Sequence, residues 1–449
     1  FWPPDDVESM RAEVPRPIPY RDLFGVILGN LLESYDFVIY SCFAVQIGHA
    51  LFPTASTLNS LLMALGTFGA GFITRPIGAI VIGAYADRRG RRPAMLLCFG
   101  LMGGSILMLA LTPSYSAIGL AAPVIAIVAR MTQGFSLGGE VGSNTAFLIE
   151  ASPPAKRAIF LSWQGVGQLV ALFTGSIIGL ALTTFMSTAA LNAYGWRIAF
   201  LLGVLTLPVG VWLRNALPET LDDDSDEVTP PAREEIARPS SRFALAKQEW
   251  RVLVLGFVLV GSGAIGSYIS VYIVSYAQDA LGLSAHAGFL AEMMSGVASV
   301  PAILLGGWLS DRYGRWPVNV GGNLLNLVAI IPIFEWVVRA HSETVLVLGM
   351  AALGFISCLN TGSFYASLGE SLPKRIRVSG YGIIYSVGVA LLGGTTQLVA
   401  TWLIRITGSS MAPAWYLMAA TAVAQIAFML LPESAPRRLA RKSRRQAWR

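Results

Sequence analysis

Long apolar stretches dominate this sequence and limit the folds that are open to it. About twelve of them approach or exceed the roughly 20 residues that a helix needs to cross a bilayer. Only 13% of the residues are charged, about half the share found in soluble domains. The runs are continuous, which favours an all-α membrane protein over a β-barrel. We expect spans at 22–48, 57–86, 93–112, 118–149, 156–186, 193–216, 250–280, 285–310, 317–340, 343–371, 376–406 and 411–431.

One long polar segment divides the expected spans six and six. It covers 217–249 and includes the acidic, proline-containing run LDDDSDEVTPPAREE, which is typical of a solvated linker. The sequence therefore predicts an N-terminal segment at 1–21, a helical bundle at 22–216, a second bundle at 250–431 and a basic tail at 432–449.

Positive charges gather in alternate loops and in the C-terminal tail. By the positive-inside rule, both termini and the linker are expected in the cytoplasm. The net charge of +6 is then a topology signal, and no soluble basic face favours nucleic acid as a partner. The tail either lies against anionic membrane lipid or is solvated.

A short motif occurs at the equivalent place in both halves. GAYADRRGRRP (83–93) follows the second expected span, and GWLSDRYGRWP (307–317) follows the eighth. We expect the charges of these turns, with those flanking the turn after the tenth span, to form salt bridges that close a cytoplasmic gate, although a static role is the alternative. These residues are Asp87, Arg88, Arg91, Asp311, Arg312, Arg315, Glu370 and Arg377.

These motifs carry a family resemblance. The pattern G-x-x-x-D-R-x-G-R-R resembles the signature of the major facilitator superfamily, and RMTQGFSLGGE (130–140) resembles its fourth-helix motif. GNLLESYDF (29–37) resembles the metabolite:proton symporter subfamily, and SWQGVGQ (162–168) is most similar to its citrate and tricarballylate symporters. The resemblance implies twelve transmembrane helices in two six-helix bundles, with a site at their interface. It also implies a monomeric symporter in a bacterial plasma membrane.

Five ionisable residues lie well inside apolar spans, where a charge costs about 2.5–3.5 kcal/mol or more. At the rise of an α-helix, Asp36 lies roughly 21 Å from the inner end of its span, and Arg75 and Arg130 lie roughly 18 Å from one end of theirs. These three therefore share a depth near the middle of the bilayer. Glu33 is one turn nearer the cytoplasm, and Glu140 lies roughly 13 Å from the inner side.

The acids suggest proton coupling. A carboxyl group kept from water holds its proton more tightly, and a nearby arginine weakens that hold. Glu33 and Asp36 are therefore expected to form the proton-coupling pair, with Glu140 as a relay. The alternative is that either acid forms a fixed ion pair with Arg75 or Arg130.

The substrate site is expected to combine cations with neutral polar groups. Asn30 shares the face of Glu33, Asp36 and Tyr40 on the first helix, and this face is expected to line the cavity. A guanidinium matches the planar geometry of a carboxylate. The expected substrate-binding residues are Asn30, Arg75, Arg130, Gln133, Gln164, Tyr272, Asn360 and Tyr385.

Three further features carry weaker expectations. A tyrosine stripe at Tyr268, Tyr272 and Tyr276 serves either packing or binding. Gly134 is expected to allow close approach of another helix. Glu292 lies roughly 10 Å from the outer surface and is expected to be interfacial, with a gate or a second acid as the alternative.

Together these observations predict a proton symporter importing an organic anion, of the di- or tricarboxylate class such as citrate. The alternatives are a symporter for a zwitterion of the betaine or proline type, and a membrane sensor that does not transport. No nucleophile–base pairing, metal-ligand spacing or phosphate-binding glycine loop points to an enzyme. No cofactor is expected, and the expected partners are the small anion, protons and lipid.

Overall fold

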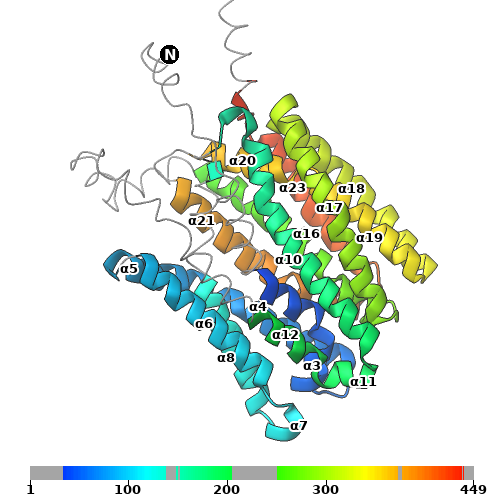
Figure 1. Ribbon diagram of the computed structural model, residues 1–449. Coiled ribbons are helices and arrows are strands. Elements are labelled where there is room, and N and C mark those ends of the chain that lie inside the picture. The colour runs from blue at the N-terminus through cyan, green and yellow to red at the C-terminus, as the bar shows by residue number, and fades with distance from the viewer. Residues whose placement is uncertain are drawn as a thin grey trace, which may run out of the picture.

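Helices are the only regular secondary structure in the described part of the chain. The structure is a computed structural model, and it describes residues 34–89, 91–137, 148–149, 152–204, 250–372, 377–436 and 438 (Figure 1). Eight helical segments among these residues are long and apolar enough to cross a membrane, and two shorter apolar helices cover Gly100–Leu111 and Ala121–Leu137. The predicted all-α membrane fold is thereby confirmed.

The first half begins with helical residues 34–42 and continues into α3 (Ala44–Leu51). The other elements of this half follow in order: α4 (Thr57–Ile73), α5 (Arg75–Arg89), α6 (Arg91–Leu111), α7 (Tyr115–Ile118), α8 (Ala121–Leu137), the 3₁₀ turn η1 (Pro154–Lys156), α10 (Arg157–Phe185), α11 (Thr188–Ala190), the π-helix η2 (Leu191–Gly195) and α12 (Trp196–Val204).

The second half begins at residue 250. Its elements are α16 (Trp250–Asp279), α17 (Ala285–Tyr313), α18 (Arg315–Ala340), α19 (Glu343–Cys358), α20 (Thr361–Ser371), α21 (Arg377–Gly388), the π-helix η4 (Val389–Gly393), α22 (Gly394–Thr407) and α23 (Ala412–Leu430). The predicted linker, 217–249, and the N-terminal segment, 1–21, lie outside the described residues, so the domain boundaries remain predictions.

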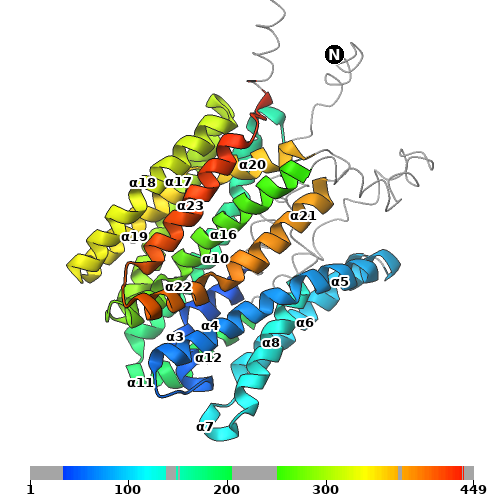
Figure 2. The ribbon, with the colours of Figure 1, turned by 180° about the vertical axis from the view of Figure 1, so that it is seen from behind.

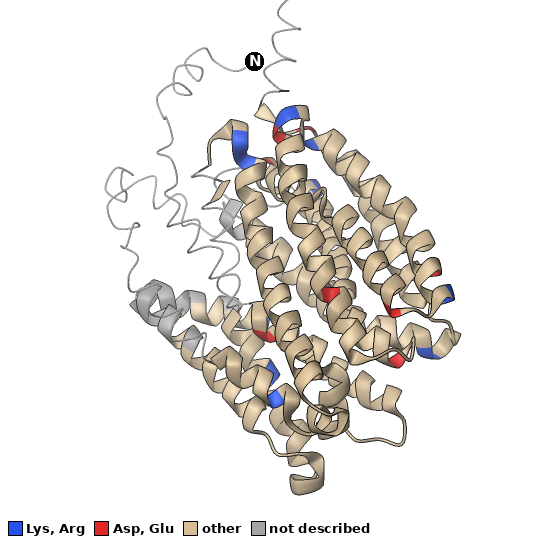
Figure 3. Ribbon diagram, turned by 45° about the vertical axis from the view of Figure 1, so that its right-hand side comes forward, with Lys and Arg blue, Asp and Glu red and all other residues tan. Residues whose placement is uncertain are grey.

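Apolar side chains cover the outer faces of the helices. Val328 of α18 is 65% exposed and Phe185 of α10 is 86% exposed, as expected where lipid replaces water as the neighbour. Most charged residues of the described part lie near helix ends, and a few lie within the bundles (Figure 3). Those few are the candidates for a functional site.

Glycine allows two helices of the first half to cross closely. A Cβ added at Gly134 of α8 would lie 1.5 Å from the carbonyl oxygen of Gly71 on α4, so no larger residue fits there. Thr74, at the end of α4, donates a 2.6 Å hydrogen bond to the carbonyl of Met131 on α8. This crossing holds the start of α5 against α8, as the sequence predicted for Gly134.

The two halves meet mainly in three places. The first of them is formed by α10, which packs against both α17 and α20; the others are α4 with α22 and α3 with α16 (Figure 2). Gln46 donates a 2.9 Å hydrogen bond to Gln278 across the α3–α16 contact, and the rings of Phe43 and Phe289 lie 5.1 Å apart. These contacts join the halves at the end of the interface near α3 and the C-terminal end of α16, and a cavity lies farther along it.

Candidate functional site

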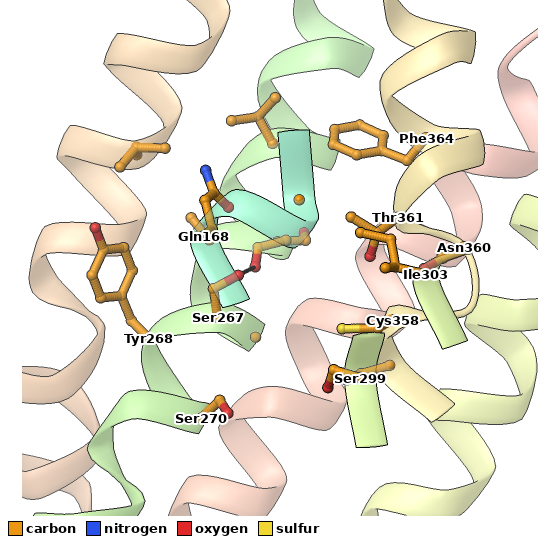
Figure 4. Close-up of a pocket in the computed structure, with 18 of the residues that line it drawn as sticks. Gln168, Ser267, Tyr268, Ser270, Ser299, Ile303, Cys358, Asn360, Thr361 and Phe364 are labelled. Carbon is orange, nitrogen blue, oxygen red and sulfur yellow. Dashed lines mark hydrogen bonds between the residues drawn. The ribbon is translucent and has the colours of Figure 1, made fainter. Parts of the chain in front are cut away.

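A cavity of about 320 Å³ lies between the two halves. This volume is at the lower end of the range typical of small-molecule sites. Helix α10 contributes Gln164, Gly165 and Gln168, while α16 and α17 face them from the other half (Figure 4). Its polar lining outside α10 and Arg75 consists of Ser34, Ser262, Ser267, Tyr268, Ser270, Ser299, Asn323, Asn326, Ser357, Asn360, Thr361, Tyr365, Tyr385 and Thr421.

Breaks in two long helices shape this lining. Helix α19 ends at Cys358 and α20 begins at Thr361, so Asn360 lies at the interruption, beside the cavity (Figure 4). Between α21 and α22, the π-helix η4 begins at Val389, which also lines the cavity. Interrupted membrane helices and π-helical turns recur at binding sites because the regular backbone hydrogen bonding of the α-helix is broken there, which leaves backbone groups for a ligand.

Arg75 supplies the charge of the cavity. It is the first residue of α5, directly after the Thr74 break, and its guanidinium lies 4.7 Å from the ring centre of Phe37 and 4.4 Å from that of Phe72. Its Nε has no hydrogen-bond partner among the described residues. No other Lys or Arg, and no Asp or Glu, belongs to the described lining. The ring faces hold the cation without neutralising it.

Arg130 and Asp36 form a buried ion pair beside the cavity. The Arg130 Nη1 donates to the Asp36 Oδ2 at 2.9 Å, and the two side chains are 0% and 1% exposed. The same nitrogen donates to the side-chain carbonyl of Gln133. Arg130 also stacks on Phe37 and Tyr40, each 4.5 Å from its guanidinium carbon. The ring of Phe37 is thus in contact with both Arg75 and Arg130.

The predicted substrate residues divide into two groups. Arg75, Gln164, Asn360 and Tyr385 line the cavity. The rest of the described ones do not: Arg130 and Gln133 belong to the ion-pair cluster, and Tyr272 is buried in the second half, where it accepts a hydrogen bond from Thr401. Asn30, Glu33 and Glu140 lie outside the described residues.

The first helix is rotated relative to the expectation. Ser34, Phe37 and Val38 face the cavity, whereas Asp36 faces Arg130 and Tyr40 donates to the carbonyl of Ala64. The expectation that Asp36 and Tyr40 line the cavity was wrong. Both side chains find polar partners on neighbouring helices, and that requirement sets the rotation.

Several lining residues were missed. Gln168, Ser299 and the pair Asn323 and Asn326 all lie within apolar spans. The two asparagines are three residues apart on α18 and share a face, and buried amides in a membrane span are a usable signal. Serines and threonines carry no such signal, because they bond to their own helix backbone, as Ser299 does to Ser295.

Glu292 was placed wrongly. It is 0% exposed in α17, and neither carboxylate oxygen has a hydrogen-bond partner among the described residues. The expectation of an interfacial residue is therefore wrong. Depth along the helix gave no information on whether the side chain faced outward or toward another helix.

A second charged cluster lies where α10, α17, α18 and α20 meet. Asp311 of α17 accepts hydrogen bonds from the backbone nitrogens of Ala158 and Ile159, at 3.1 and 3.0 Å, and so caps α10 of the other half. Arg315 donates to Asp311 at 2.6 Å and to Glu370 at 3.2 Å. Glu370 also lies 3.7 Å from Arg157. The cluster therefore links the two halves.

The structure joins three of the predicted gate residues: Asp311, Arg315 and Glu370. Arg312 is exposed and lies over the rings of Trp308 and Tyr313. The backbones of Asp87, Arg88, Arg91 and Arg377 are helical, but their side chains lie outside the described part of the structure.

Comparisons with known proteins identify relatives that align over most of the chain. The chain is 35% identical over 402 residues to the citrate-proton symporter of Salmonella typhi, an alignment covering 88% of this chain and 91% of that protein. It is 32% identical to the alpha-ketoglutarate permease of Escherichia coli, covering 91% and 92%. It is 30% identical to the ectoine/proline transporter of Corynebacterium glutamicum, covering 97% and 87%.

A solved structure with the same fold is also known. The crystal structure of a D-xylose-proton symporter superposes with a TM-score of 0.73, covering 93% of this chain and 98% of that one at 16% identity. The sequence profile of the Major Facilitator Superfamily matches residues 26–300 and 278–449. The predicted two-bundle fold and the family resemblance are both confirmed: this chain belongs to the Major Facilitator Superfamily.

Proposed function

We propose that this protein is a proton-coupled symporter that imports an organic anion, most favourably a di- or tricarboxylate such as citrate. The observation that carries the proposal is the Arg75 guanidinium in a cavity between the halves, with no carboxylate in the described lining. A site with one uncompensated cation attracts anions. The citrate-proton symporters and the alpha-ketoglutarate permease among the relatives support the same substrate class.

Substrate recognition would use Arg75 and the neutral polar groups around it. The planar guanidinium can donate two parallel hydrogen bonds to one carboxylate. Gln164, Gln168 and Asn360 can serve a second carboxylate or a hydroxyl. The ring of Phe37 fixes the guanidinium and leaves its edge for the substrate.

Proton coupling would use the ion pair behind the Phe37 ring. While Asp36 is ionised, it compensates the charge of Arg130. A proton on Asp36 removes that compensation and leaves Arg130 as a second cation near the cavity, which favours an anion there. Glu33 and Glu140 remain candidates for delivering the proton. Coupling then follows because proton and anion each favour the binding of the other.

Alternating access would require the cluster around Asp311 to break. Its bonds to the first turn of α10 and the contact between Glu370 and Arg157 both cross between the halves. Opening on this side, which we take as cytoplasmic in a bacterial inner membrane, separates them. Asp87, Arg88, Arg91 and Arg377 are proposed to take part.

Purified protein in proteoliposomes tests the proposal. Labelled citrate, succinate and betaine are supplied with and without an imposed pH gradient. We expect uptake of citrate or succinate that rises with the inward proton gradient. Uptake of betaine alone would replace the anion with a zwitterion, as in several relatives, and accumulation driven by sodium alone would remove the proton role.

Arg75→Gln sharpens the test. Loss of a charged hydrogen-bonding group costs about 1.5–3 kcal/mol, so citrate binding measured by calorimetry should weaken roughly tenfold to a hundredfold. Arg405→Gln is the matched control, because Arg405 is an exposed arginine in the last turn of α22. Unchanged affinity in Arg75→Gln would contradict the assigned site.

A further inference from the structure

Glu292 is a buried acid for which the scheme above has no role. It lies on the face of α17 that packs against the first half, as its neighbours show. Phe289, three residues earlier, fills the space above Gly179 of α10, where an added Cβ would lie 2.1 Å from the ring. Gly296, four residues later, lies next to Leu172 of α10: a Cβ added at Gly296 would lie 3.9 Å from the Leu172 side chain. Residues at these spacings share one face.

The register between α10 and α17 places Ser176 opposite Glu292. The two helices run side by side in opposite directions (Figure 1). Gly179 of α10 faces Phe289 of α17, and Leu172 of α10 faces Gly296 of α17. Ser176 lies between Leu172 and Gly179 on α10, and Glu292 lies between Phe289 and Gly296 on α17. Ser176 is 0% exposed, and its hydroxyl also has no hydrogen-bond partner among the described residues.

The same seam leads into the cavity. Toward the cytoplasmic side, Ile303 of α17 meets Gly165 of α10, and both line the cavity together with Ser299. Glu292 lies two turns outward of Ser299 on the same helix, roughly 10 Å away at the helical rise. An opening of the seam would therefore connect Glu292 with the cavity.

No described basic group compensates a charge on Glu292. Helix α10 carries no ionisable side chain after Arg157. From the first helix, Cys42 lies within electrostatic range of Glu292. Several ionisable groups of α16 and α19 have partners elsewhere: Tyr272 accepts from Thr401, Tyr276 donates to the carbonyl of Ser410, Asp279 interacts with His49, Glu343 accepts from Ser284 and Cys358 interacts with Ser299.

A lone carboxylate in such surroundings would be very unstable, whereas the neutral acid costs only a few kcal/mol at most. We infer that Glu292 is a second proton-carrying residue, which holds its proton while the outer seam between α10 and α17 is packed and releases it when the seam opens to water. This inference rests on the proposed proton symport. It ties proton release to the outer half of the interface, whereas Asp36 acts beside the cavity.

Transport by Glu292→Gln separates a proton carrier from a packing residue. Glutamine keeps the shape of the protonated acid. The yield of folded protein and the rate of citrate exchange, measured with the same pH on both sides of the membrane, should therefore change less than about twofold. Accumulation driven by a pH gradient should fall by about tenfold per pH unit of gradient, because one coupled proton is lost. Glu292→Asp should recover part of the coupling. Glu335→Gln, an exposed glutamate paired with Arg339 on α18, is the control.

A second measurement needs no substrate. The infrared spectrum of the reconstituted protein contains the carbonyl stretch of protonated carboxyl groups, and the spectrum of Glu292→Gln is subtracted from that of the native protein at the same pH. We expect one such band in the native protein to be missing in Glu292→Gln. Unchanged spectra, or full pH-driven accumulation by Glu292→Gln, would overturn the inference. Native protein that accumulates nothing with a pH gradient but keeps the Glu292 band would contradict the proposed function instead.

Discussion

Asp36→Asn tests whether the buried ion pair works as described. The Arg130 and Asp36 side chains are almost completely buried and 2.9 Å apart, so at an effective dielectric constant near 20 their attraction is about 6 kcal/mol. Removal of one partner of a buried pair usually costs about 3–5 kcal/mol, because the other charge is left uncompensated.

The surroundings of Arg130 reduce that cost. Asparagine can still accept a hydrogen bond, and the guanidinium keeps its contacts with the rings of Phe37, Tyr40 and Phe68, each worth about 0.5–2 kcal/mol. We therefore expect a loss of about 3 kcal/mol in the free energy of unfolding. Denaturant unfolding in detergent, followed by tryptophan fluorescence, measures it.

The double variant Asp36→Asn with Arg130→Gln distinguishes structure from transport. It removes both charges and should regain all but about 1 kcal/mol of the native stability, since replacement of a whole buried pair is often close to neutral. It should still fail to accumulate citrate with a pH gradient. A loss below about 1 kcal/mol in the free energy of unfolding of Asp36→Asn would refute the energetic argument. Citrate accumulation driven by a pH gradient in the double variant would show that the ion pair has only a structural role.

Two further changes test the helix contacts. Gly134→Ala should lower the free energy of unfolding by about 1–3 kcal/mol, because its Cβ would lie 1.5 Å from the Gly71 carbonyl oxygen. Thermal unfolding measures the change. The control is Gly104→Ala, which has open space around it and should be neutral or slightly stabilising. Asp311→Asn should weaken the cap of α10 by about 0.5–2 kcal/mol and widen spin-label distances between the first turn of α10 and the last turn of α17. Unchanged distances would count against the gate.

The sequence predicted depth well because helical rise is constant. Asp36, Arg75 and Arg130 were expected at one level, and the structure places both guanidinium groups against the Phe37 ring and Asp36 against Arg130. The sequence predicted rotation poorly. Tyr40 was expected in the cavity and is instead bonded to Ala64, because the direction of a side chain depends on polar partners supplied by other helices.

Glu292 is a second residue whose side-chain direction the sequence did not predict. Its distance from the helix end suggested an interfacial group, yet Phe289 and Gly296 place it against α10. The pairing of α10 with α17 joins segments more than a hundred residues apart in the chain. The spacing of residues along one helix does not determine which residues of a distant helix will face them. Neither the burial of Glu292 nor the position of Ser176 opposite it could therefore be predicted from the sequence.

The sequence by itself determined the membrane-spanning helices, the repeated turn motif and the presence of charges deep within the spans, since apolar length and the cost of a buried charge are local properties. Only the tertiary structure decided that Arg130 pairs with Asp36, whereas Arg75 lines the cavity with no Asp or Glu in the described lining. That choice depends on how neighbouring helices cross and rotate, and packing between distant segments sets both.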